Sequence, residues 1–183
     1  MNLMVSNSET LRVATFNRKK FQVVLLYLLA HSRKQTIEGK KKLAKLLYFA
    51  DFNFFEAFEQ PLTGATYKAL QMGPFPEELD GALASISGEG KQIDVSKKPT
   101  GLQNDAVVYM LAVEPDSLSF DDLTRDECRV LDKVISELGG MSGKALEDLS
   151  HREAPYNAVV QGERIPYELA YYRGKTMEEL VGA

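Results

Sequence analysis

The stretch GKKKLAKLLYFADFNFFEAFEQPLTGATYKALQMGPFP, residues 39–76, decides the fold of this 183-residue chain. Its first half carries apolar residues at spacings of three and four, which is typical of a helix with one face in a core. These residues are Leu43, Leu46, Leu47, Ala50, Phe54 and Phe58. The second half is rich in proline and glycine, which favour turns. We therefore predict a helix over 40–58, then a turn, and then a short strand within 65–71 that ends at the glycine and prolines of 73–76.

Asp51 is unusual in the predicted helix, because its neighbours one turn away are apolar or aromatic. These neighbours are Leu47, Tyr48, Phe54 and Phe55. A carboxylate buried among such side chains without a partner is costly. Asp51 must therefore lie on a seam that reaches water or be met by a group from elsewhere in the chain, and we favour a distant partner.

Five blocks of the sequence, in the same order, are similar to a known family. They are KLAKLLYFAD (42–51), QPLTGATYKAL (60–70), GPFPEEL (73–79), LSHREAPYN (149–157) and GERIPYELA (162–170). Together they resemble the Panacea domain, a SocA-like antitoxin family of bacteria and phages that was formerly a domain of unknown function. The resemblance extends over roughly residues 20–172. One departure is Tyr156, because the family pattern often has a tryptophan after the late proline and this chain has no tryptophan.

The resemblance implies a function in neutralising a toxin. Members of the family resemble antitoxins that bind a protein toxin encoded beside them. In one variant the antitoxin is an adaptor that delivers the toxin to a Clp-type protease. A cognate protein toxin is thus the expected partner, and a protease of this type is a further one.

Composition limits the class of protein. A length of 183 residues with 44% hydrophobic residues supports one core, and a net charge of −4 argues against a dedicated nucleic-acid binder. Cys128 is the only cysteine, so an internal disulfide is excluded. The longest apolar run, 23–30, is far shorter than the ~20 residues that cross a bilayer, and the start lacks a signal-peptide pattern. We expect a soluble, cytoplasmic protein without a membrane partner.

Charge is distributed unevenly along the chain. Residues 1–60 hold ten Lys or Arg against five Asp or Glu, whereas residues 114–153 hold five against eleven. This asymmetry indicates either a basic face for an acidic partner or two solvated faces that steer assembly. The lysines of 40–45 and the basic residues of 18–20 likewise form either a docking patch, for an acidic toxin surface or for nucleic acid, or a solubilising edge.

Spacing and capping residues outside 39–76 predict the remaining elements. Helices are expected over 17–32, 77–87, 124–138 and 143–151, with helical turns over 167–172. Alternating residues predict two antiparallel strands, near 93–95 and at 106–113. The predicted fold is an α-dominated α+β single domain with helices packed around a small antiparallel sheet. Its expected parts are a loose arm at 1–16, the domain at 17–174 and a tail at 175–183.

No set of residues points to an active site. His31 is expected at the end of a helix, where a cation is favourable near the C-terminus. The alternative interpretation is that His31 is a ligand or a catalytic base. A GxSxG nucleophile turn, zinc-ligand spacing and a phosphate loop are all missing from the sequence. We therefore expect that the protein is not an enzyme and that it binds neither a cofactor nor a metal. Two alternatives to the antitoxin stay open: a DNA-binding regulator using the basic early helices, and an enzyme with an unrecognised pocket.

The helix at 40–58 has more aromatic surface than one face needs. Most of its rings are expected in the core, but Phe52 or Phe55 on the outer side could anchor a partner. Interfaces place such anchors at their centre. The predicted partner-binding residues are therefore Phe52 and Phe55, with Lys41 and Lys45 from the basic run.

The late LSH block is expected to fold back onto residues 45–74. In this hypothesis His151 or Arg152 meets Asp51, or the hydroxyls of Tyr48 and Tyr67. The reason is that Asp51 has no partner on its own helix. The predicted cluster is a buried polar tie that holds the fold together, and direct contact of these residues with a toxin is the alternative.

Overall fold

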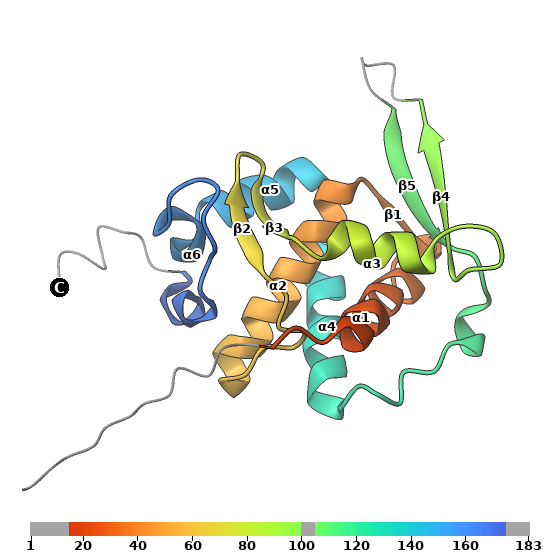
Figure 1. The fold of residues 1–183 in the computed structure, drawn as a ribbon, viewed down its shortest axis with the longest axis horizontal. Helices are drawn as coiled ribbons and strands as arrows, with labels where there is room; N and C mark the ends of the chain where they lie inside the picture. The colour runs from red at the N-terminus through yellow and green to blue at the C-terminus, as the bar shows by residue number, and fades with distance from the viewer. Residues whose placement is uncertain (1–14, 100–104, 175–183) are drawn as a thin grey trace, which may run out of the picture.

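The computed structural model describes residues 15–99 and 105–174, and Figure 1 shows its fold. The predicted tail at 175–183 lies outside the described residues, and so does the predicted arm except for Thr15 and Phe16, of which Phe16 packs against the core. Helices dominate and the sheets are small and antiparallel. The prediction of an α-dominated α+β domain is confirmed.

Helix α2, Lys40–Phe58, forms the centre of the molecule (Figure 1). It contacts α1 (Arg18–Ala30) and α4 (Arg125–Leu138) on one side. It also contacts α5 (Gly143–His151) and the 3-10 helix η3 (Tyr167–Tyr172). Because neighbours surround it, α2 is buried almost continuously between Leu43 and Phe55. The helix predicted over 40–58 is confirmed at both ends.

Two of the predicted helix starts, those of α1 and α4, are confirmed by their caps. The Asn17 side chain accepts a hydrogen bond from the backbone N–H of Lys20 at the start of α1. Thr124 and Glu127 form a capping box at the start of α4. Such caps satisfy backbone N–H groups that the first turn of a helix leaves unpaired.

The larger sheet has the order β1-β5-β4, with both strand pairs antiparallel. Strands β4 (Ile93–Lys98) and β5 (Ala106–Leu111) form the predicted hairpin, which projects from the body of the molecule (Figure 1). Strand β1, Thr36–Glu38, was not predicted, because three residues are too few to show an alternating pattern. The connector after β5 contains a short 3-10 helix, η2 (Pro115–Ser117).

The smaller sheet is a hairpin of β2 (Tyr67–Leu70) and β3 (Gly73–Pro76). The strand predicted within 65–71 is confirmed, but residues 73–76, which were predicted only to end it, form a second strand, β3. Ala69 opposes Pro74, yet its backbone N–H and C=O bond to Glu163 and Gly162 on the other side. Because the backbone groups of Ala69 bond to the other side, the residue opposite it needs no backbone N–H for the sheet. A proline, which has no N–H, is therefore tolerated there.

Two short helices complete the fold. Helix α3, Leu79–Ile86, lies within the predicted 77–87 but begins later, because the Glu78 carboxylate accepts the backbone N–H of Thr66 at 3.0 and 3.1 Å. Helix α6, Ala154–Asn157, lies outside the helices predicted from the sequence. With Pro155 in its first turn, where a missing N–H costs nothing, this helix turns the chain back toward η3.

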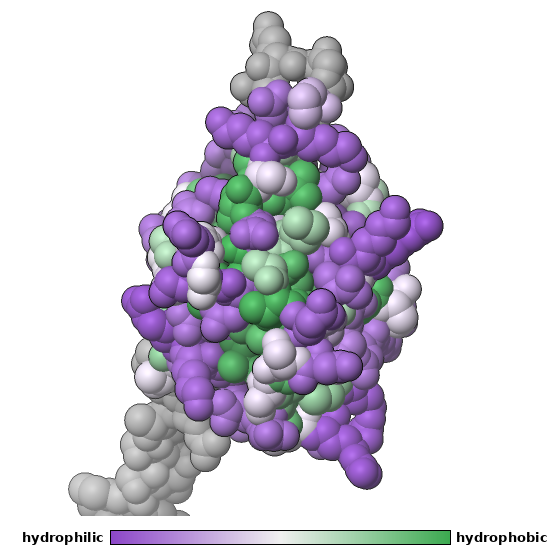
Figure 2. Space-filling view, turned by 90° about the vertical axis from the view of Figure 1, so that its right-hand side faces the viewer, coloured by the Kyte–Doolittle hydropathy of each residue, from purple (hydrophilic) through white to green (hydrophobic). Residues whose placement is uncertain are grey.

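Figure 2 shows the side of the molecule that lies on the right in Figure 1, where hydrophobic residues form a stripe between polar flanks. The connector between β5 and α4 runs along this side of Figure 1. Its Leu118 and Phe120 line a shallow hollow together with Ala30 and His31. The His31 ring stacks on Tyr27 with 4.0 Å between centroids, so this histidine at the end of α1 is part of the packing.

Candidate functional site

Asp51 is fully buried and its partners come from another segment, as predicted. Its Oδ1 accepts the backbone N–H of Thr63 at 2.7 Å. Its Oδ2 accepts the hydroxyls of Thr63 at 2.6 Å and Tyr67 at 2.7 Å. Three donors thus satisfy the carboxylate, and they tie the turn after α2 and strand β2 to the central helix.

Burial raises the pKa of Asp51 from 3.8 to about 6, while the hydrogen bonds from Thr63 and Tyr67 lower it. The folded protein therefore holds the Asp51 proton more tightly than the unfolded chain does. The stability contributed by this group is greatest below pH 4 and is lost as the pH rises toward and beyond 6. At neutral pH the donors to Asp51 bind a charged acceptor.

Replacing Tyr67 by phenylalanine is expected to destabilise the fold more at pH 7.5 than at pH 5.0. Removing a donor to an ionised buried carboxylate costs about 2 kcal/mol, against about 1 kcal/mol for a neutral acceptor. Urea unfolding at both pH values measures the difference. Tyr156→Phe is the control, since its hydroxyl donates to the Leu70 carbonyl at 2.8 Å and should show no such pH dependence. Equal losses for Tyr67→Phe at the two pH values would contradict the interpretation.

The late block folds back onto α2, but through other residues than predicted. Tyr48 donates its hydroxyl to Glu153 Oε2 at 2.9 Å, and Arg173 donates to Glu153 Oε1 at 2.8 and 2.9 Å. The prediction that His151 or Arg152 meets Asp51, Tyr48 or Tyr67 is wrong. His151 stacks on Tyr156 with 4.4 Å between centroids, and Arg152 is exposed at the end of α5, so neither side chain bonds to Asp51, Tyr48 or Tyr67.

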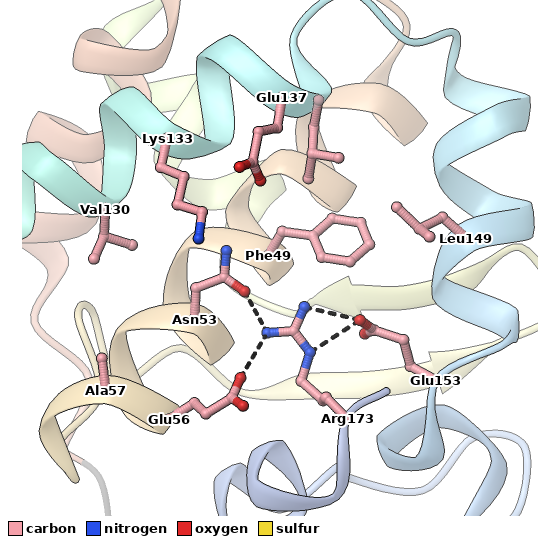
Figure 3. A pocket seen from close by; sticks show the side chains of 11 residues that line it. Phe49, Asn53, Glu56, Ala57, Val130, Lys133, Glu137, Leu149, Glu153 and Arg173 are labelled. Atoms are coloured by element: carbon pink, nitrogen blue, oxygen red, sulfur yellow. Dashed lines mark hydrogen bonds and ion pairs between the residues drawn. The ribbon is translucent and has the colours of Figure 1, made fainter. Parts of the chain in front are cut away.

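Arg173 lies on the floor of a cleft between α2, α4 and α5 (Figure 3). Its guanidinium also contacts the Asn53 side-chain oxygen and lies 3.7 Å from Glu56, with the Phe49 ring 5.5 Å below its Cζ. The cleft has a volume of about 480 Å³. That size falls in the usual range for a ligand site. Arg173 was missed from the sequence, because it stands outside every patterned segment.

The wall of this cleft carries free charges. Lys133 and Glu137 of α4 point into it across from Asn53 and Arg173 (Figure 3). Within residues 15–99 and 105–174, neither side chain has an ion-pair partner within 4 Å. Val130, Leu138 and Leu149 add apolar surface. The α2–α4–α5 cleft can therefore take up a partner surface that combines apolar groups with both signs of charge.

The lysines at the start of α2 are bound within the molecule. Lys40 pairs with Asp80 at 2.7 Å, and Lys41 pairs with Glu147 of α5. Lys42 donates to the Gly139 carbonyl at 2.6 Å, where a cation suits the C-terminal end of α4. These internal contacts explain why three cations begin a helix whose own dipole opposes them.

The charge asymmetry of the sequence also has internal partners. Lys19 pairs with Asp122 at 2.7 Å, and Lys20 pairs with the largely buried Glu127 of α4 at 2.5 Å. Together with Lys41 and Glu147, these pairs join the basic early segments to the acidic late ones. The structure thus shows a third arrangement beside the two interpretations, because these basic and acidic segments pair with each other in the folded chain.

Three predicted partner-binding residues are not on the surface. Phe52 is fully buried, with its ring stacked on Tyr167 at 5.0 Å between centroids. Phe55 is 9% exposed and packs on the same tyrosine at 5.4 Å. The placement of either ring on the outer side is wrong, because η3 covers that side of α2. Lys45 is also buried, at 1% exposure, and lies under the β2–β3 hairpin.

The described residues also bear on two other possibilities, a metal site and a membrane-spanning helix. In the described part of the chain, no group of three or more His, Cys, Asp or Glu is arranged to hold a metal ion. None of the helices described there is both long and apolar enough to span a bilayer.

The fold and the site together define a class of protein. It is a single α+β domain in which buried polar ties fix a central helix and an open, charged cleft lies beside that helix. The family model of the antitoxin SocA-like, Panacea domain matches residues 43–156, and this chain belongs to that family. The matched region runs from α2 to α6 and so contains most of the cleft. A comparison with curated proteins gives no match.

Proposed function

We propose that this chain is an antitoxin that neutralises a cognate protein toxin by binding it directly. Membership of the antitoxin SocA-like family is the observation that carries the proposal. The α2–α4–α5 cleft supports it, because it combines apolar surface with Lys133 and Glu137, which have no ion-pair partner among the described residues, and such a surface suits a protein partner. No catalytic step is involved, and we expect neutralisation in the cytoplasm.

Co-expression with the neighbouring gene tests this function. If that gene encodes the toxin, its expression alone should stop growth, and the antitoxin should restore growth and co-purify with it. A neighbour that is not toxic, or whose toxicity the chain does not relieve, contradicts the proposal. A salt-dependent gel shift without toxin binding would instead favour a DNA-binding regulator.

The cleft itself is tested by reversing one charge. Lys133→Glu is expected to weaken toxin binding about tenfold, because interface centres are sensitive to unmatched charge. Lys97→Glu, the same change on strand β4, should leave binding unchanged. Equal affinities of both variants for the toxin would show that the toxin contact lies outside the cleft.

Toxin turnover separates the two modes of neutralisation. Simple occlusion leaves the half-life of the bound toxin unchanged. An adaptor shortens this half-life, and deletion of the Clp-type protease restores it. Pulse-chase measurement of the toxin, with and without the antitoxin, distinguishes the two outcomes.

A further inference from the structure

A second cavity lies under the β2–β3 hairpin, away from the α2–α4–α5 cleft. We call it the hairpin pocket, and it is lined by Leu70, Met72, Gly73 and Phe75 of the hairpin and by Lys40, Lys41 and Lys45 of α2. Its volume is about 100 Å³. An apolar cavity of about 150 Å³ takes up benzene, so this pocket has room for one small apolar side chain.

Lys45 is the unusual residue of the pocket. Its Nζ donates to the Pro74 carbonyl at 2.6 Å, and among the described residues that is its only acceptor. A lysine ammonium has three donors. In the same part of the chain, no carboxylate lies within 4 Å of Nζ, although the side chain is only 1% exposed. A buried cation in this state lacks the partners that normally accompany it.

The backbone fixes Lys45 in place. Gly73 has a φ of +88°, and a Cβ there would lie 2.8 Å from Lys45 Cε and 2.7 Å from Ser150 Oγ. Only glycine lets β3 approach so closely. The hairpin therefore holds the amine against the pocket, whereas the exposed Leu70 and Met72, at 39% and 57%, are open to a partner.

The surroundings make the charge of Lys45 adjustable. Burial lowers its pKa to about 7, with Glu147 raising it and Lys41 lowering it. His151 faces it from α5, with its pKa lowered by burial and its Nε2 buried without a hydrogen-bond partner in the described chain. Residues 71–76 carry no titratable side chain. A carboxylate placed in the pocket would favour the protonated amine and supply the missing acceptors.

We propose that the hairpin pocket is an anchor point for the toxin, which inserts an apolar side chain next to a carboxylate. Lys45 binds the carboxylate, while Leu70, Met72 and Phe75 cover the apolar part. Charge complementarity selects this occupant, because Lys40 and Lys41 are already paired with Asp80 and Glu147, whereas Lys45 has no carboxylate within 4 Å among the described residues. This assignment rests on the proposed antitoxin function.

Calorimetric titration with the purified toxin tests the pocket. Met72→Glu places a negative charge on the exposed rim, which repels the incoming carboxylate. Lys45→Met removes the amine but fills nearly the same space as lysine. Each is expected to weaken binding about tenfold, as loss of a central contact does. The control is Val160→Glu, since Val160 is 68% exposed and lies outside the pocket. Urea unfolding should show Lys45→Met at least as stable as the wild type, because an unpaired buried charge has been removed.

The pH dependence of toxin binding distinguishes a direct contact by Lys45 from a purely structural role of this residue. Between pH 6.5 and 8.5 the Lys45 amine loses its proton, so wild-type affinity should fall about tenfold. Lys45→Met should lack this pH-dependent loss of affinity. The comparison therefore separates the titration of Lys45 from any titration of groups on the toxin.

The outcomes separate the two proposals. If the wild type binds the toxin and both pocket variants bind equally well, the hairpin pocket is not the anchor and the antitoxin function stands. If the wild type does not bind the toxin at all, the antitoxin function fails and the pocket assignment fails with it.

Discussion

Phe52→Ala is expected to cost about 3–5 kcal/mol of stability, the range for truncating a large aromatic side chain in a core. Phe52 is fully buried, and its ring packs on Tyr48, Tyr67 and Tyr167 with centroids 4.4, 5.6 and 5.0 Å away. Domains are stable by only about 5–15 kcal/mol, so the loss is a large part of the total. Urea unfolding followed by circular dichroism measures it.

The matched control for Phe52→Ala lies on the same helix. Phe58 is 37% exposed, so Phe58→Ala removes less buried surface and should cost about 1 kcal/mol. If Phe52→Ala proved no more destabilising than the control and abolished toxin binding, the original interpretation of Phe52 as a surface anchor would be right.

Glu153→Gln has the second large expected effect, a loss of about 3 kcal/mol, because it leaves a buried cation without its main partner. The side chains of Arg173 and Glu153 are only 10% and 13% exposed, and the guanidinium makes two hydrogen bonds to Glu153. Glutamine keeps the shape and can still accept the Tyr48 hydroxyl. Since both side chains are largely buried, added salt should change the loss little.

A double variant tests whether the loss comes from the unpaired charge. Glu153→Gln combined with Arg173→Met removes both charges, and it should recover much of the stability that Glu153→Gln loses. Urea unfolding of the wild type, both single variants and the double variant completes the cycle. Additive losses would show that the ion pair contributes nothing of its own.

Local signals predicted the helices well. Helix α2 has its apolar residues at helical spacing over its whole length, and the Thr124 and Glu127 pair marks the start of α4 by chemistry within one turn. Such elements depend on neighbours in sequence. The β2–β3 hairpin was harder, since the effect of Pro74 depends on Gly162 and Glu163, which bond to the far side of β2.

Site residues were predicted less well, because their environment is set by distant segments. The need of Asp51 for a partner was evident from its apolar neighbours, but only the folded chain identifies Thr63 and Tyr67 as donors. Lysines are usually exposed, so nothing in the sequence distinguished buried Lys45 from Lys41. Arg173 gave no signal, since its partners Glu153 and Asn53 are 20 and 120 residues away.

Four contacts between the early and the late segments have nearly the same sequence separation, between 105 and 107 residues. They are Lys20 with Glu127, Tyr27 with Asp132, Lys41 with Glu147, and Tyr48 with Glu153. Each requires closing a loop of more than a hundred residues, which slows folding. A nascent chain that has reached only β5 has α1 and α2 without the helices that cover them. Such a chain exposes apolar surface and unmatched lysines, the features that chaperones and proteases act on. A chain that stops before α5 lacks the partners of Lys41 and Tyr48, so we expect such a truncated chain not to accumulate as folded protein.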